Sequence, residues 1–139
     1  MDLHATYPAL SDLRHRARRR VPKFVWEYLD SGTGDEHAKA RNRARLEAVG
    51  LMPQVLQGEF TPDLSSTLLG LDLPLPFGIA PIGMSGLIWP QAERHLARAA
   101  ARHGIPYTLS TVATQHPEDI APLLGPQAWF QLSPPRDPA

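Results

Sequence analysis

Polar and small residues recur where three short apolar runs of the chain end. The first run covers residues 75–80, and the stretch from Pro81 to Gly86 that follows it has little side-chain bulk. Ser110 closes the second run, and Gln131 lies near the end of the third. Backbone amides, a hydroxyl and a side-chain amide can hold a polar heterocycle by hydrogen bonds, but none is a strong acid or base. These residues therefore indicate a binding surface for a flat ligand, to which glycine lets the backbone come close.

Buried parallel strands would bring these run ends together at one edge of a sheet. Strands are expected at 75–80, 106–110 and 128–132, and the helices between them at 90–103 and 117–125. This alternation is typical of a parallel sheet with right-handed crossovers. The strand spacing suits a (β/α)8 barrel, and a doubly wound sheet would show the same pattern. In both folds the carboxyl ends of the strands hold the ligand.

The beginning of the chain is expected to be helical. Pro22 precedes a helix expected at 23–30, which stops at Ser31-Gly32. Proline at the first turn and glycine just past the last turn are the usual boundary signals of a helix. Two further helices are expected at 8–20 and 35–48.

A small hairpin is expected between these helices and the strands. Residues 51–56 and 64–69 are short extended runs on either side of a turn region that contains glycine and proline. We therefore divide the chain into residues 1–74, with the helices and a capping hairpin, and residues 75–139, with the first βαβαβ units. The expected fold class is α/β, a partial (β/α)8 TIM barrel with about three of its strands.

The bulk composition is typical of a soluble globular domain. The 139 residues are 42% hydrophobic and 20% charged, and 14 basic residues balance 14 acidic ones. A net charge of zero gives no general attraction to nucleic acid, and the basic run at 14–20 is interpreted as a solvated helix face. The lack of cysteine excludes disulfides, thiolate catalysis and cysteine zinc sites.

Targeting and metal signals are also missing from the sequence. No apolar run approaches the ~20 residues of a membrane-spanning helix, and Met1–His4 does not begin a signal peptide. We therefore expect no membrane span and a cytoplasmic location. Asp35-Glu36-His37 has no partner at metal-ligand spacing, so no metal site is expected.

Several segments together resemble the FMN-dependent α-hydroxy acid oxidases and dehydrogenases, which include glycolate oxidase, L-lactate dehydrogenase and mandelate dehydrogenase. Each segment is weak alone, but they occur in the family's order with similar spacing and cover nearly the whole chain. The resemblance is to the N-terminal part of that family. The matching segments are Pro22–Gly32, Asn42-Arg43, Leu69-Gly70, Ile79-Ala80-Pro81, Leu109–Thr114 and Trp129–Leu132.

The resemblance implies FMN as cofactor and removal of a hydride from the α-carbon of a small 2-hydroxy acid, which gives a 2-oxo acid. Tyr28 matches the tyrosine that binds the substrate carboxylate over the flavin. Ser110 and Gln131 match positions that form hydrogen bonds with the isoalloxazine, and residues 80–83 match the backbone that faces the ring. The implied cofactor-binding residues are Ala80, Pro81, Ile82, Gly83, Ser110 and Gln131.

Two features depart from the family pattern. The residue two positions after Gln131 is usually a tyrosine that faces the substrate, and here it is Ser133, which implies a weaker contact or room for a larger substrate. The family's catalytic histidine, its flavin lysine and its carboxylate-binding arginines match positions beyond Ala139. None of the six histidines lies in the matching context, so no catalytic residue is expected within this chain.

Alternative functions remain open on the sequence. As a separate polypeptide the chain is expected to bind FMN weakly or not at all, and it could instead be a non-catalytic fragment or assembly module that pairs with a second chain carrying the remaining strands. Another FMN-binding or phosphate-binding barrel would require the matches of Tyr28 and Gln131 to be accidental. Relatives commonly form tetramers, so a homo-oligomer is expected of the full-length protein.

Overall fold

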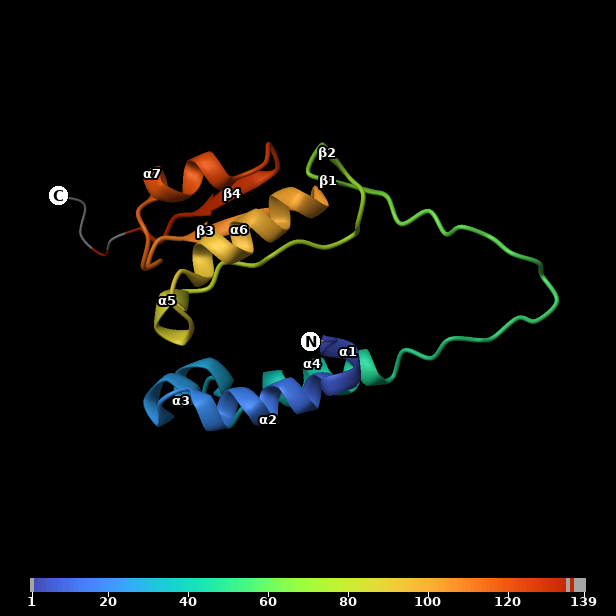
Figure 1. Ribbon diagram of the computed structural model, residues 1–139, viewed down its shortest axis with the longest axis horizontal. Helices are drawn as coiled ribbons and strands as arrows, with labels where there is room; N and C mark the ends of the chain where they lie inside the picture. Colours follow the sequence, from blue (N-terminus) through green and yellow to red (C-terminus); the bar gives the residue numbers. More distant parts are fainter. Residues whose placement is uncertain (1, 135, 137–139) are drawn as a thin grey trace. The chain divides into compact units, whose positions relative to one another are not determined.

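The computed structural model describes residues 2–134 and 136, apart from the side chains of Leu3 and His4. The chain forms two compact units, Met1–Thr61 and Pro62–Ala139. The first unit contains helices only, and the second combines helices with short strands (Figure 1). The fold class is therefore α/β, as the sequence predicted. No described helix combines the length and the apolar character needed to cross a membrane.

Four helices make up the first unit. The aspartate of its second helix caps it, because the Asp12 carboxylate accepts the Ala9 N–H at 3.0 Å. Val25 of the third helix is buried, and an Arg14–Asp30 ion pair of 2.7 Å joins the second helix to the end of the third. They are α1 (Leu3–Thr6), α2 (Leu10–Arg20), α3 (Lys23–Asp30) and α4 (His37–Glu47). The three predicted helices, α2, α3 and α4, are confirmed to within two residues at each end, and α1 was not predicted.

The expected pairing of 51–56 with 64–69 is wrong. Residues 49–65 contain no helix or strand, and the hairpin that does form joins β1 (Ser66–Leu68) to β2 (Leu71–Leu73) in antiparallel register. Leu69 and Gly70 between them have φ of 51° and 80°. Two consecutive left-handed residues form the tight turn that suits the twist of a hairpin, so the chain reverses at once. The hairpin belongs to the second unit, whereas the sequence division placed it with the helices.

Parallel pairing organises the second unit. β3 (Tyr107–Ser110) pairs with β4 (Ala128–Gln131) from Tyr107 opposite Ala128 to Ser110 opposite Gln131. The expected strand at 75–80 is reduced to one parallel bridge, between Ile79 and Tyr107. Pro76 and Pro81 restrict it, because proline offers no N–H to a sheet. The remaining elements are α5 (Ser85–Ile88), α6 (Ala92–His103), α7 (Pro117–Ile120) and a 3-10 turn (Ala121–Leu123).

One face of the parallel strands holds the core. Tyr107 and Leu109 are buried in a cluster with Ala97 and Ala100 of α6 and with Ile120 of α7. α6 therefore packs along β3, as Figure 1 shows. Because side chains alternate along a strand, Thr108 and Ser110 point to the opposite face of the sheet.

A close backbone approach holds the bridge segment against β3. The Ile79 N–H donates to the Pro106 carbonyl at 2.8 Å, and the Thr108 N–H donates to the Ile79 carbonyl at 3.0 Å. A Cβ added to Gly78 would lie 2.9 Å from the Pro106 carbonyl oxygen and 3.0 Å from the Pro106 Cβ. Glycine at position 78 is therefore required by space.

Gly78→Ala should destabilise the protein by about 1–3 kcal/mol, because the new methyl group would push the bridge segment away from Pro106. Urea denaturation followed by circular dichroism measures the change. Gly50→Ala is the control, since a Cβ there meets nothing within 4 Å, and it should shift stability by no more than about 0.5 kcal/mol. Equal stability of the two variants would contradict the steric argument.

Candidate functional site

Ser110 and Gln131 lie side by side at the carboxyl ends of β3 and β4. The register places them directly opposite one another, and the Ser110 hydroxyl donates to Gln131 Oε1 at 3.2 Å. The Val112 N–H donates to Ser110 Oγ at 3.3 Å, which fixes the hydroxyl from the other side. Ser110 is buried, whereas Gln131 is exposed, and Gln131 Nε2 makes no hydrogen bond to the described residues. The structure thus brings together two of the predicted cofactor residues and leaves an amide donor available.

The segment Ala80–Gly83 lies beside this pair. It is held before its start by the pairing of Ile79 with β3, and after its end by the Met84 N–H, which donates to the Val112 carbonyl at 2.9 Å. Ala80 and Ile82 are exposed, and the residues between and after them are half-buried. Backbone and small side chains therefore form one border of the edge at which Ser110 lies.

Thr111 anchors the chain that follows β4, a role that the sequence analysis did not assign. Its hydroxyl donates to the Gln131 carbonyl and accepts the Ser133 N–H, the latter at 2.9 Å. Ser133 is thereby held near Gln131 by its backbone, and its side chain is exposed. The only sequence signal was a hydroxyl residue just past a strand end, which does not reveal a partner 22 residues away.

Tyr28 belongs to the first unit. It lies on α3 with 46% of its surface exposed, next to the buried Val25 turn of that helix. Its role at a substrate site stays a prediction.

The edge that contains Ser110 and Gln131 is uncharged, and a buried carboxylate lies behind it. Glu93 of α6 is 1% exposed and accepts hydrogen bonds from the Thr114 N–H and hydroxyl. Burial acts to raise the pKa of Glu93, but hydrogen bonds from Thr114, from its own backbone and from the Ser85 side chain together outweigh it, and the pKa lies below its ordinary value. Burial and the negative charge of Glu93 raise the pKa of Tyr107 to about 12. Neither group exchanges a proton readily near neutral pH.

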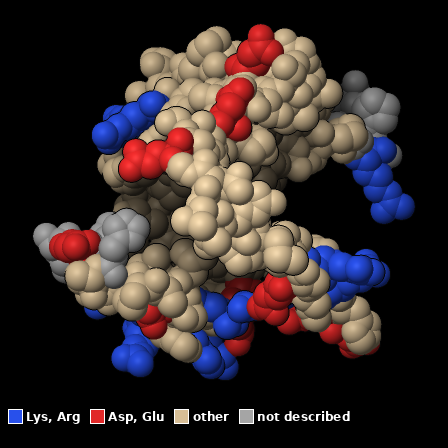
Figure 2. All heavy atoms as spheres, turned by 90° about the vertical axis from the view of Figure 1, so that its right-hand side faces the viewer, with Lys and Arg blue, Asp and Glu red and all other residues tan. Residues whose placement is uncertain are grey.

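Metal ligation is not supported by the described residues, which contain no group of three or more histidine, aspartate, glutamate or cysteine side chains suited to a metal ion. Charged side chains of both signs appear on the face shown in Figure 2. The candidate site is therefore defined by hydrogen-bonding groups and small residues.

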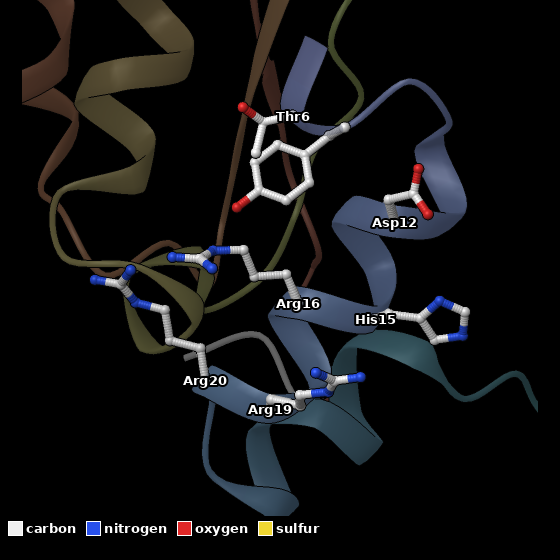
Figure 3. Close-up of a pocket in the computed structure, with 7 residues that line it drawn as sticks. Thr6, Asp12, His15, Arg16, Arg19 and Arg20 are labelled. Atoms are coloured by element: carbon white, nitrogen blue, oxygen red, sulfur yellow. The ribbon is translucent and has the colours of Figure 1, made fainter. Parts of the chain in front are cut away.

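Two hollows have different relations to the candidate site. One of about 380 Å³ lies on the open face of the strands, where Gly78, Ala80 and Pro81 line it together with Thr108 and Trp129. Another, of about 710 Å³, belongs to the first unit and contains none of the predicted site residues (Figure 3). Its lining includes Arg16 of α2, whose guanidinium lies 5.7 Å from the centre of the Tyr7 ring. Its other lining residues are Thr6, Asp12, His15, Arg19 and Arg20.

Comparison with known proteins identifies the family. The sequence model of the FMN-dependent dehydrogenase family matches residues 17–139. L-lactate dehydrogenase of Ectopseudomonas mendocina (strain ymp) is 40% identical over 124 residues, which are 89% of this chain and 33% of that protein. L-lactate dehydrogenase of Xanthobacter autotrophicus is 41% identical over 122 residues, or 88% of this chain and 31% of that protein.

Solved structures give the same result. A soluble mutant of the membrane-associated (S)-mandelate dehydrogenase from Pseudomonas putida matches with a TM-score of 0.77 and 36% identity, over 88% of this chain and 35% of that one. A mandelate oxidase matches with a TM-score of 0.81 and 34% identity, over 94% of this chain and 38% of that one. The chain belongs to the FMN-dependent dehydrogenase family, whose characterised relatives here are hydroxy acid oxidoreductases. It spans about a third of the length of the curated relatives that it matches.

Glu93→Gln should reduce the loss of stability in acid. A carboxylate with a lowered folded pKa stabilises the fold above its unfolded pKa, for which 4.5 is the reference value, and this contribution disappears as the pH falls through the lower folded pKa. Unfolding by urea between neutral pH and about pH 3 measures the effect. The exposed Glu118→Gln serves as control and should follow the wild type. A Glu93→Gln protein with the wild-type pH dependence would contradict the assignment.

Proposed function

We propose that this chain forms part of an FMN site in an enzyme that oxidises a small 2-hydroxy acid to a 2-oxo acid. The supporting observation is the hydrogen-bonded pair Ser110 and Gln131 at the carboxyl edge of two parallel strands, beside the segment Ala80–Gly83. The same edge holds the ligand in parallel α/β folds. We also propose that these strands are the first strands of a (β/α)8 barrel.

The chemistry of this edge fits a flavin ring. A flat heterocycle with donors and acceptors along its rim needs hydrogen-bonding partners at its edge and little bulk at its face. Gln131 offers an exposed amide, Ser110 offers a hydroxyl, and Ala80–Gly83 offers backbone beside small side chains. Ser110, Gln131 and Ala80–Gly83, the described residues assigned to this edge, are all uncharged, which suits a neutral ring.

These groups indicate what the cofactor and the residues of this chain would each contribute to the reaction. The chemistry that FMN would supply here is acceptance of the hydride equivalent from the α-carbon of the substrate. Ser110 and Gln131 would fix the ring in its plane, and Thr111 would hold the chain near Ser133 at the same edge. Glu93 is ionised and buried, and Tyr107 has a pKa of about 12, so neither suits general base catalysis near neutral pH. Within this chain we assign binding and orientation, and no proton transfer.

The substrate side is assigned to Tyr28 and Ser133. A phenol is a suitable donor to a carboxylate, and Tyr28 is half exposed on α3. A serine in place of the family's usual tyrosine leaves more space at position 133, so we propose that the pocket accepts a substrate with a larger side chain. L-lactate and mandelate, after which relatives are named, have a small and a large side chain respectively.

A role in assembly is the second candidate function. Within the described residues β4 pairs only with β3, and Phe130 and Leu132 are 51% and 71% exposed. An unpaired strand edge flanked by apolar side chains is a template for further strands. A module of this kind would bind a partner that carries further barrel strands, and by relation to the family it would form homo-oligomers.

A chimera tests the proposed cofactor site. Residues 17–139 would replace the matching third of the Ectopseudomonas mendocina L-lactate dehydrogenase, and the product should bind FMN and bleach it when a 2-hydroxy acid is added. Gln131→Leu should weaken FMN binding about tenfold through loss of the ring hydrogen bond. Gln57→Leu, in the exposed segment of the first unit that contains no helix or strand, is the control. A folded chimera without FMN affinity would overturn the proposal.

Tyr28→Phe tests the substrate role in the same chimera. Removal of the phenol should raise KM for the 2-hydroxy acid or lower kcat, with a loss of about tenfold in kcat/KM, and should leave FMN affinity unchanged. Steady-state kinetics with L-lactate and mandelate measure it. Unchanged kcat and KM would remove Tyr28 from the substrate site.

A further inference from the structure

Two loops follow strand-like segments of the second unit, and one buried side chain connects them. The first loop, defined here as residues 81–88, follows the segment at Ile79 and includes the short helix α5 with Gly86. The second contains Thr114 and follows β3. Glu93 Oε1 accepts hydrogen bonds from the Thr114 N–H at 2.9 Å, the Thr114 hydroxyl at 2.8 Å and the Gly86 N–H at 3.3 Å. Glu93, Gly86 and Thr114 are here called the Glu93 cluster.

Glu93 is a buried carboxylate, and the cost of burying its charge must be offset by other interactions. The side chain is 1% exposed, and Oε2 makes no hydrogen bond within the described residues. An ionised carboxylate away from water is strongly unfavourable unless donors surround it, and here the donors converge on one oxygen. An alanine or leucine at this helix position would pack against the core at no such cost. The carboxylate therefore connects the two loops, because both of them donate hydrogen bonds to it.

The two loops are also in direct contact, so that a single added methyl group would push them apart. A Cβ added to Gly86 would lie 2.0 Å from the Thr114 hydroxyl oxygen and 3.0 Å from the Thr114 Cβ. On the other side of the first loop, the Met84 N–H donates to the Val112 carbonyl at 2.9 Å. The segment Ala80–Gly83 therefore ends in a loop that is held at two points against residues 112–114.

We propose that Glu93 is a positioning residue for the ligand edge: its carboxylate holds the loop at Gly86 against the loop at Thr114 and so sets the distance between Ala80–Gly83 and Ser110. This inference rests on the proposed function of the same edge as an FMN site. The hydrogen bonds of Glu93 given above go to Gly86 and Thr114. Glu93 acts through the backbone of the two loops that carry them.

A purely structural role in the core predicts a different pattern of flexibility. Loss of core packing at Glu93 would loosen α6 and its contacts with β3 throughout. Loss of the loop contacts would release the amides of Gly86 and Thr114 and leave the last turns of α6, around Ala100, protected. Hydrogen exchange distinguishes these outcomes, because each amide reports its own opening.

Hydrogen–deuterium exchange on the 139-residue chain without FMN is the primary test. Glu93→Leu should raise exchange of the Gly86 and Thr114 amides about tenfold or more, with less than about a twofold change in α6 near Ala100. Thr114→Val removes only the hydroxyl donor and should give a smaller increase at Gly86. Glu118→Gln is the matched carboxylate control and should change neither loop.

Milder variants keep the test decisive if Glu93→Leu does not fold. Glu93→Gln retains an acceptor oxygen but weakens charge-assisted hydrogen bonds by about half, and it should still raise exchange at Gly86 and Thr114 above that of Glu118→Gln. Unchanged loop exchange in Glu93→Gln and Thr114→Val, or an equal rise along α6, would overturn the positioning role.

A second test measures the binding of FMN to the L-lactate dehydrogenase chimera. Glu93→Gln should raise the Kd for FMN about three- to tenfold, while Glu118→Gln leaves it unchanged. If the unmodified chimera fails to bind FMN, the proposed function fails, whatever the exchange result. If it binds FMN and Glu93→Gln binds equally well despite faster loop exchange, only the positioning inference fails.

Discussion

The parallel pairing around Tyr107 is the constraint on which the second unit depends. Tyr107 bridges Ile79 on one side and pairs with Ala128 on the other, so three segments run in the same direction. Parallel strands end at the same edge of a sheet, and this is why residues 21 apart, Ser110 and Gln131, meet there. The close approach of Gly78 to Pro106 allows the first segment to join this arrangement.

α6 performs two tasks along one buried face, which carries Glu93, Ala97 and Ala100. Ala97 and Ala100 pack against Tyr107 and supply core contacts, while Glu93 reaches the loops beyond the strand ends. Burial of apolar surface fixes the helix against the sheet, and the fixed helix in turn holds a carboxylate where two loops need an acceptor. One helix therefore both packs on the core and holds the two loops beside the strand ends.

Local signals predicted most elements of the fold. The helix at 23–30 and the strand ends at Ser110 and Gln131 follow from capping residues and short apolar runs, which act within one or two turns of chain. The hairpin was misplaced because several glycine-containing stretches compete as turns, and the consecutive left-handed residues Leu69 and Gly70 decide among them. The strand at 75–80 was too long because its prolines cannot donate to a neighbour, and the position of that neighbour is not visible in the run itself.

The sequence by itself determined the order of the main helices and strands, the uncharged residues Ser110 and Gln131 at the strand ends and, through the combined matches, membership of the FMN-dependent dehydrogenase family. Only the tertiary structure decided that Glu93 faces Thr114, 21 residues away, and that Thr111 holds the Ser133 N–H. Periodicity and caps are local properties that a sequence displays directly. Hydrogen bonds between distant loops depend on how the helix packs on the strands, and packing of that kind is settled only when the whole unit has folded.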